Sequence, residues 1–138
     1  MNILVRKDGF MEIAKVTDGE INVLNVLWEN GEIKATDIVK ILKDQIGWNR
    51  NTTYTFISRL VDKKIIERSD PGFYCKALYD RNQIGVNETK SFLNKLYNGS
   101  ISSLVSSFFE KEKLTSEQLR EMQNIIDKYK DGDKDKRI

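Results

Sequence analysis

The segment 49–63 gathers polar side chains of the kinds that bind nucleic acid bases and phosphates. Its sequence, NRNTTYTFISRLVDK, also places apolar residues at helical spacing, at Phe56, Ile57, Leu60 and Val61. On a helix, the amide, hydroxyl and guanidinium groups would therefore lie mainly opposite the apolar side. An amide can pair with adenine, a guanidinium with guanine or phosphate, and a Thr methyl group can contact thymine. The candidate DNA contacts are Arg50, Asn51, Thr52, Tyr54, Thr55, Arg59, Lys63 and Arg68.

The local charge is compatible with this chemistry. Between Ile46 and Lys76, six basic residues against three acidic ones leave a net charge of +3, whereas the whole chain carries +2. Basic side chains can bind phosphate and so position a protein on DNA without reading its sequence. A polar, solvated helix face is the alternative interpretation, and charge alone does not decide between the two.

Composition argues against catalysis and against metal binding. The 138 residues include no His and one Cys, Cys75, which excludes His-based triads, His metal sites, Cys-based zinc sites and intrachain disulfides. A Ser or Thr nucleophile served by Lys would remain, but no motif indicates one. We therefore predict a protein that is not an enzyme and that uses no cofactor and no metal.

Nothing in the sequence indicates a membrane protein or an exported one. No apolar run approaches the roughly 20 residues that span a bilayer. The opening residues, MNILVRKDGF, lack the apolar stretch of a secretory signal. The balance of 32% charged and 39% hydrophobic residues is typical of a soluble globular domain. We expect a cytoplasmic location without membrane insertion.

Two helices are predicted before the polar segment. Thr17 and Glu20 form a capping-box pattern, which predicts a first helix over 18–29. A short extended piece around Ile33 follows. The apolar pattern of ATDIVKILKDQI then predicts a second helix, which ends near Gly47. These two helices supply the framework on which the polar segment would be held.

The polar segment itself predicts a third helix, followed by a β-hairpin. Asn49 or Asn51 would cap this helix, which would extend to about Lys64. The sequence SDPG at 69–72 is a strong turn signal, and the residues at 73–75 favour a strand. The order helix, short strand, helix, helix and hairpin is typical of a winged helix-turn-helix domain, with the third helix as the recognition helix. We assign residues 13–80 to this domain and residues 1–12 to an N-terminal extension.

The remaining chain is predicted to be helical and to form a dimerisation domain over 81–130. After an expected linker, DRNQIG, Asn87 would cap one helix, and Thr115 with Gln118 would cap another. The apolar stripes on these helices are too short to form a core alone, so we predict a homodimer interface; completion of a monomeric core is the alternative. The predicted dimerisation residues are Phe92, Leu96, Ile101, Leu104, Val105, Phe108, Leu119, Met122 and Ile126. Residues 131–138 would form a charged, frayed tail. The fold class is therefore mainly α with a small β-wing.

Three stretches of the sequence resemble the penicillinase repressor family, which includes the β-lactamase and methicillin-resistance repressors. They are TDGEINVLNVLWENG, GWNRNTTYTFISRLVDKKII and SFLNKLYNGSISSLVSSFFEKEKLTSEQLREMQNIID, of which the last is the most specific. The resemblance runs from about Ile13 to Lys130. It implies a homodimeric repressor with an N-terminal winged helix and a C-terminal helical dimerisation domain.

The resemblance also implies partners and a switch. Family members bind palindromic operators containing TACA/TGTA elements and repress a β-lactamase or penicillin-binding-protein gene. A membrane sensor with a zinc-protease domain detects the β-lactam, and the repressor is then cleaved within the dimerisation domain. That cleavage weakens the dimer and releases the DNA.

Some positions depart from the family pattern. The usual cleavage bond joins Asn to Phe, and alignment places it at Ser107–Phe108, where Ser replaces Asn. The family often has Ser-Pro-Lys-Thr where this chain has Asn-Arg-Asn-Thr, at 49–52. Family members commonly begin near Met11, so residues 1–10 would be either an extension or the result of an upstream start. A copper-responsive branch carries paired cysteines near the C-terminus; these are missing here, so we reject metal sensing.

The leading functional hypothesis is a dimeric, sequence-specific repressor of β-lactam-resistance genes that is relieved by proteolytic cleavage. A repressor of the same family that answers another signal without cleavage is the first alternative. A winged-helix adaptor that binds protein instead of DNA is the second, and the nearly balanced net charge favours it. An enzyme ranks last, because no catalytic constellation is present.

Overall fold

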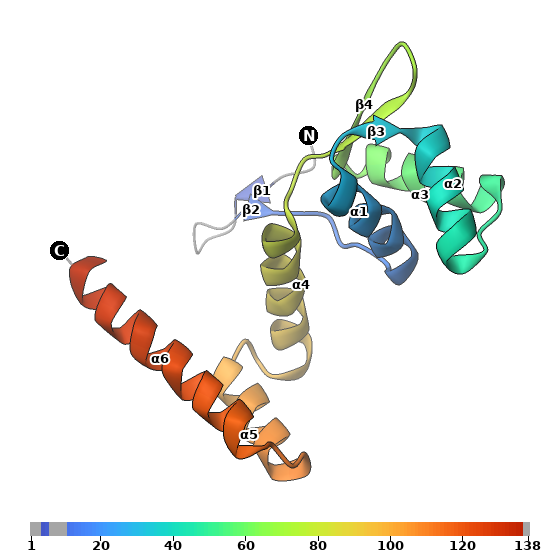
Figure 1. Cartoon of the computed structure of the whole chain (residues 1–138). Coiled ribbons are helices and arrows are strands. Elements are labelled where there is room, and N and C mark those ends of the chain that lie inside the picture. The colour runs from blue at the N-terminus through green and yellow to red at the C-terminus, as the bar shows by residue number, and fades with distance from the viewer. Residues whose placement is uncertain (1–3, 6–10, 137–138) are drawn as a thin grey trace. The chain divides into compact units, whose positions relative to one another are not determined.

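The computed structural model describes residues 4–5 and 11–136, and its first compact unit ends at Phe92. Within this unit, helices α1 (Asp18–Asn30), α2 (Ala35–Ile46) and α3 (Arg50–Asp62) lie together with a small sheet (Figure 1). The sheet has the order β3-β5-β4, formed by β3 (Ile33–Lys34), β4 (Ile66–Ser69) and β5 (Tyr74–Ala77). The unit is therefore a winged helix, and the predicted fold class is confirmed.

Local signals in the sequence set the helix ends. Thr17 and Glu20 form the predicted capping box, with Thr17 N donating to Glu20 Oε1 at 2.7 Å and Glu20 N donating to Thr17 Oγ1 at 3.3 Å. Gly47 ends α2 with a left-handed backbone, at φ 72°. Asn49 caps α3 by accepting a hydrogen bond from Thr52 N at 2.8 Å. Of the two caps proposed for the recognition helix, the structure therefore selects Asn49.

The core of this unit lies between the three helices and the inner face of the sheet. Apolar residues of α1, α2 and α3 meet there, and the wing contributes from its first strand and from the centre of β5. The residues that are fully buried, or nearly so, are Val23, Leu24, Val26, Leu27, Ala35, Ile38, Leu42, Ile57, Leu60, Ile65, Ile66 and Cys75. Burial raises the pKa of the Cys75 thiol to about 11, against a smaller opposing effect of Arg68. Cys75 is therefore a neutral packing residue.

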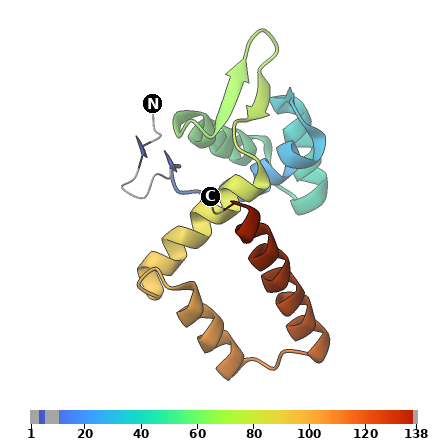
Figure 2. The same ribbon diagram turned by 90° about the vertical axis from the view of Figure 1, so that its left-hand side faces the viewer.

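The hairpin is shifted by one residue from its predicted position. Ser69 pairs with Tyr74, so that the turn consists of Asp70–Phe73 and not of residues 69–72. Phe73, predicted to belong to the strand, has a positive φ of 51°. Its carbonyl accepts a hydrogen bond from Ala35 N at 2.9 Å, which ties the turn to the start of α2. Figure 2 shows the hairpin extending beyond the three helices.

The predicted linker DRNQIG is instead the beginning of a helix. Helix α4 (Arg81–Leu96) is continuous, and Asn87 lies within it and does not cap it. Asp80 provides the cap: its Oδ1 accepts from Gln83 N at 2.8 Å, and its N–H donates to Gln83 Oε1 at 2.9 Å. This reciprocal pair satisfies the backbone at the helix start, which explains why polar residues with one glycine still form helix.

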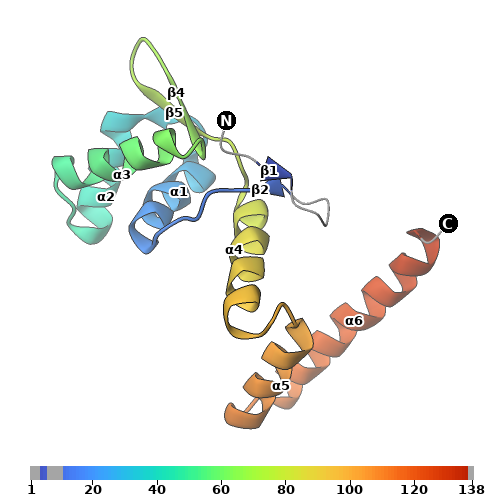
Figure 3. The same cartoon turned by 180° about the vertical axis from the view of Figure 1, so that it is seen from behind.

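The second compact unit begins at Leu93 and contains α5 (Ile101–Lys111) and α6 (Ser116–Lys136), joined by short turns (Figure 3). The predicted capping box is present, with Gln118 N donating to Thr115 Oγ1 at 3.0 Å. The tail was predicted to fray from residue 131, but α6 continues to Lys136. Residues 137–138 lie outside the described part.

The N-terminal extension contains a short antiparallel pair of strands. Strands β1 (Leu4–Val5) and β2 (Met11–Glu12) pair in the register Leu4 with Glu12 and Val5 with Met11. The rest of the extension, residues 1–3 and 6–10, lies outside the described residues. The chain leaves β2 for the segment 13–17, which passes beside α4 on its way to α1.

Candidate nucleic-acid interface

Helix α3 presents one continuous polar face. Its members recur at helical spacing and line a shallow hollow on the outside of the unit. These residues are Asn51, Tyr54, Thr55, Ser58, Arg59 and Asp62. Four of the predicted contacts (Asn51, Tyr54, Thr55 and Arg59) are thus brought together, and Ser58 and Asp62 belong to the same surface. The hollow offers amide, hydroxyl, guanidinium and carboxylate groups, which together can hydrogen-bond several base edges.

The first turn of α3 is ordered by its own side chains. Arg50 is exposed, and its guanidinium lies over the Tyr54 ring, 5.0 Å from the ring centre. The Thr55 hydroxyl donates to Asn51 O at 2.9 Å. Thr52 is half-buried, and its backbone N–H donates to the Asn49 cap. This turn therefore presents Arg50 and Asn51 fully outward and Thr52 only in part.

Aromatic contacts attach the wing to the recognition helix. The Tyr54 ring meets the Phe73 ring edge to face, with ring centres 5.7 Å apart. The Arg68 guanidinium stacks 3.6 Å from the centre of the Phe73 ring, and its Nε lies 3.1 Å from Asp70 Oδ2. Arg68 is therefore engaged within the wing, where it holds the turn. Its predicted DNA contact would have to be made from this paired position.

Two residues near the wing were not among the predicted DNA contacts. Lys34 on β3 stands opposite Tyr74 on β5, and its ammonium lies 5.6 Å from the centre of the exposed Tyr74 ring. They lie side by side because β3 pairs with β5. The only signal in the sequence was the short extended piece around Ile33, which did not reveal its pairing partner.

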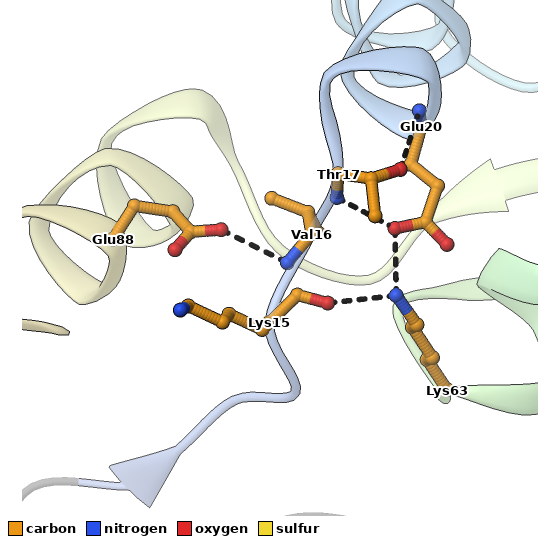
Figure 4. Close-up of polar contacts among 6 residues, drawn as sticks. All are labelled: Lys15, Val16, Thr17, Glu20, Lys63 and Glu88. Atoms are coloured by element: carbon orange, nitrogen blue, oxygen red, sulfur yellow. Dashed lines mark hydrogen bonds and ion pairs between the residues drawn. The ribbon is translucent and has the colours of Figure 1, made fainter.

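Lys63 does not line the hollow on α3, and its predicted DNA contact stays a prediction. Its ammonium donates to Glu20 Oε1 at 2.7 Å and to Lys15 O at 2.8 Å (Figure 4). The Glu20 side chain is fully buried and that of Lys63 is 30% exposed. The ion pair joins the end of α3 to the start of α1, so the role of Lys63 in this structure is to hold the recognition helix in place.

The inward side of α3 also differs in part from its prediction. Ile57 and Leu60 are fully buried as expected, whereas Phe56 and Val61 are only half-buried. Phe56 instead stacks on Trp48, with ring centres 4.9 Å apart and an angle of 21° between the rings. Thr53 takes an inward position and is fully buried, so it cannot contribute to the polar face.

The predicted dimerisation residues lie on helices whose apolar faces remain open in the single chain. Helix α5 has no buried residue, and the exposed fraction is 50% for Phe108 and 56% for Ile126. Leu104 and Ser107 are half-buried. The other predicted residues of this surface, all exposed, are Phe92, Leu96, Ile101, Val105, Leu119 and Met122. Ser107 and Phe108 both lie within α5.

Comparison with known proteins decides the family. The family model described as "Penicillinase repressor" matches residues 16–128. This chain belongs to the penicillinase repressor family. The match covers both compact units, and the family is one of transcriptional repressors and not of enzymes.

The relatives within this family align over most of their length. The penicillinase repressor of Bacillus licheniformis is 28% identical over 127 residues, which cover 90% of this chain and 98% of the relative. The methicillin resistance regulatory protein MecI of Staphylococcus aureus strain N315 is 32% identical over 116 residues, covering 83% and 94%. A solution structure of the DNA-binding domain of the repressor BlaI aligns with a TM-score of 0.48 at 25% identity, covering 51% of this chain and 89% of that one.

Residues 4–5 and 11–136 contain neither a metal-binding cluster nor a membrane-spanning helix. Among these residues, no cluster of three or more His, Cys, Asp or Glu side chains could hold a metal ion. None of the helices in this part of the chain is both long and apolar enough to cross a membrane. The polar face of α3 is therefore the candidate functional site that the geometry defines best.

The ion pair between Lys63 and Glu20 predicts a loss of stability when Lys63 is replaced. Lys63→Met keeps the length of the side chain but leaves the buried Glu20 carboxylate without its cation. We expect the free energy of unfolding to fall by roughly 3 kcal/mol, near the lower end for a broken buried pair because Lys63 is partly exposed. Urea denaturation, monitored by tryptophan fluorescence, measures this free energy, since Trp28 and Trp48 both lie in the first unit.

Lys40→Met, at an exposed position of α2, is the matched control and should change stability by no more than about 0.5 kcal/mol. Equal losses in the two variants would show that the Lys63 pair contributes nothing specific.

Proposed function

We propose that this protein is a homodimeric, sequence-specific DNA-binding repressor of β-lactam-resistance genes that acts in the cytoplasm and is relieved by proteolysis. The observation that carries the proposal is the polar face of α3, held beside the wing in a member of the penicillinase repressor family. Relatives named as penicillinase repressors and methicillin resistance regulators support the choice of target genes.

The recognition helix would enter the major groove, which is wide enough for one α-helix. Asn51, Thr55 and Arg59 lie along its outer face, where they can meet base edges. Arg50, exposed at the start of the helix, and Lys34, beside Tyr74 of the wing, would bind backbone phosphates. We propose palindromic operators containing TACA/TGTA elements as the target.

The rigidity of the recognition helix supports this docking. Tyr54 packs edge-on against Phe73 of the wing turn, and Arg68 stacks on the same Phe73 ring. The Phe73 carbonyl also binds Ala35 N, so the wing turn is attached to α2 as well. With Lys63 fixed at the other end of α3, little ordering would be needed when the polar face enters a groove.

Dimerisation would cover the open apolar faces of α5 and α6. Large side chains that remain 36–65% exposed in the single chain, such as Met122 and Tyr129, recur on α6 at spacings of three and four residues. A second copy of the chain is the partner that such a face suits, because a palindromic operator offers two equivalent half-sites. Each bound half then raises the effective concentration of the other at its own half-site.

Relief would follow from cutting α5 at Ser107–Phe108. A protease needs an opened backbone, and α5 buries no residue within its own chain, so mainly the proposed dimer contacts would oppose its local opening. The cut would divide the apolar surface and leave α3 intact. A membrane sensor with a protease domain, activated by a β-lactam, is the proposed agent.

The polar face predicts the effect of removing its basic groups. Arg50→Ala with Arg59→Ala should weaken binding to a dyad of TACA/TGTA elements and make the salt dependence shallower. The slope of log affinity against log salt should change by about 0.9 for each phosphate that the variant no longer binds. Fluorescence anisotropy at several salt concentrations measures both effects.

Arg120→Ala is the matched control, because Arg120 is exposed on α6 in the other unit. Equal affinity of the unaltered protein for the dyad and for scrambled DNA of the same length would overturn specific repression. Unchanged binding by the double Arg variant would point to a protein-binding adaptor.

The apolar face predicts the effect of a charge placed within it. Ile126→Asp should convert the protein from twice the chain mass of 16.0 kDa to that mass, as measured by sedimentation equilibrium. Binding to the dyad should fall at least 10-fold, whereas binding to a single half-site should persist. Asn124→Asp adds the same charge about 200° away around α6 and should leave the dimer intact. A dimer that survives Ile126→Asp would exclude this face as the interface.

The proposed cleavage predicts two fragments, residues 1–107 and 108–138, when the protein is incubated with its cognate sensor protease and a β-lactam. Mass spectrometry identifies them. Ser107→Asn restores the residue usual in the family and should speed cleavage, whereas Phe108→Asp should block it. Full-length protein that persists with and without the β-lactam would instead indicate a repressor that answers another signal.

A further inference from the structure

The segment 13–17 binds the first turns of α4 and so attaches this helix to the rest of the winged-helix unit. Asn87 Nδ2 donates to Ile13 O at 3.1 Å, and Glu88 Oε1 accepts from Val16 N at 2.9 Å. Ile84, one turn earlier, is 4% exposed. Both hydrogen bonds join side chains of α4 to the backbone of residues far away in sequence. They therefore constrain the direction of the helix in addition to covering apolar surface.

Helix α1 holds the same start of α4 through other groups. Arg81 Nη1 donates to Asn25 Oδ1 at 3.0 Å, and its guanidinium lies 4.9 Å from the centre of the Trp28 ring. Trp28 Nε1 donates to Tyr79 O at 2.9 Å, just before α4 begins. With contacts at its first residue and two turns later, α4 has little freedom to pivot within this unit.

The segment that binds Glu88 also binds the end of the recognition helix. Three successive residues each make a hydrogen bond: Lys15 O accepts from Lys63 at 2.8 Å, Val16 N donates to Glu88 at 2.9 Å, and Thr17 N donates to Glu20 at 2.7 Å. Figure 4 shows these bonds meeting at one short stretch of backbone. The end of α3 and the body of α4 are therefore held by the same three residues.

We propose that Glu88, assisted by Asn87, is a positioning residue that sets the half-site spacing and rotational phase accepted by the dimer. Neither residue lies on the polar face of α3 or among the apolar residues of α5 and α6. Helix α4 runs unbroken to Leu96, so the direction fixed at Glu88 is the direction in which the chain leaves the winged-helix unit. This inference rests on the proposed dimeric DNA-binding function.

The physical consequence is selectivity for spacing. One inserted base pair rotates a half-site by about 35°, because B-DNA turns once in 10–10.5 base pairs. A rigid connection binds one spacing well and the others poorly. A connection that pivots freely accepts several spacings, but it binds the best one less tightly because ordering is then required on binding.

The test compares Glu88→Ala with Glu88→Gln in the full-length protein. Glu88→Gln removes the charge but keeps an oxygen that can accept from Val16 N, whereas Glu88→Ala removes the acceptor. Fluorescence anisotropy is measured with a single TACA/TGTA half-site and with dyads in which the two half-sites are separated by a series of spacers differing by one base pair. Asn87→Ala provides a second, independent loosening of the same attachment.

We expect the unaltered protein and Glu88→Gln to show one sharp optimum of spacing. Glu88→Ala and Asn87→Ala should lower affinity at that optimum 5- to 20-fold, flatten the profile, and keep half-site affinity within 2-fold. An unchanged profile in both of these variants would overturn the inference. Half-site affinity that falls as much as dyad affinity would also overturn it, because the hydrogen bonds would then merely support the fold.

Two further outcomes separate the possible causes of failure. A flattened profile in Glu88→Gln as well would overturn the positioning role of the hydrogen bond and assign the effect to charge. If the unaltered protein binds dyads no better than scrambled DNA, the proposed function itself fails, and the inference fails with it. A sharp spacing profile in every variant would overturn this inference and leave the proposed function standing.

Discussion

The buried carboxylate of Glu20 is the interaction on which the arrangement of the winged-helix unit depends. Its Oε1 accepts from Thr17 N and from the Lys63 ammonium, both at 2.7 Å, and so it caps α1 and anchors the end of α3 at the same time. Burying a carboxylate is costly unless a cation and hydrogen bonds compensate for the lost water. The compensation is available only when α1, α3 and the segment before α1 have their native positions. The pair therefore favours one arrangement of the recognition helix over others.

In the second unit, many large apolar side chains remain exposed within the single chain. Helices α5 and α6 are well capped, by Ser100 and by Thr115 with Gln118, yet α5 buries none of its side chains. Capping satisfies the backbone at the helix ends but does not remove apolar surface from water. The exposed apolar surface of these helices is the reason for proposing that a second copy of the chain covers it.

The sequence by itself determined the elements and the chemical character of the site. Local patterns that act over a few residues can be recognised in a single sequence. Examples are the capping box at Thr17, the periodicity of α3 and the turn signal near Pro71. The polar set Asn51, Thr55 and Arg59 was likewise predictable from helical spacing alone. Resemblance to the penicillinase repressors then indicated the family, which the match over residues 16–128 established.

Only the tertiary structure decided those features that depend on contacts between segments distant in the sequence. The ion pair of Lys63 with Glu20, 43 residues away, was not foreseen from the sequence. Lys34 reached the wing through strand pairing with Tyr74. The supposed linker became the start of α4, where Arg81 binds Asn25 of α1, 56 residues away. Each of these outcomes depends on contacts between distant segments, and helical or strand periodicity carries no information about which distant segment a residue will meet.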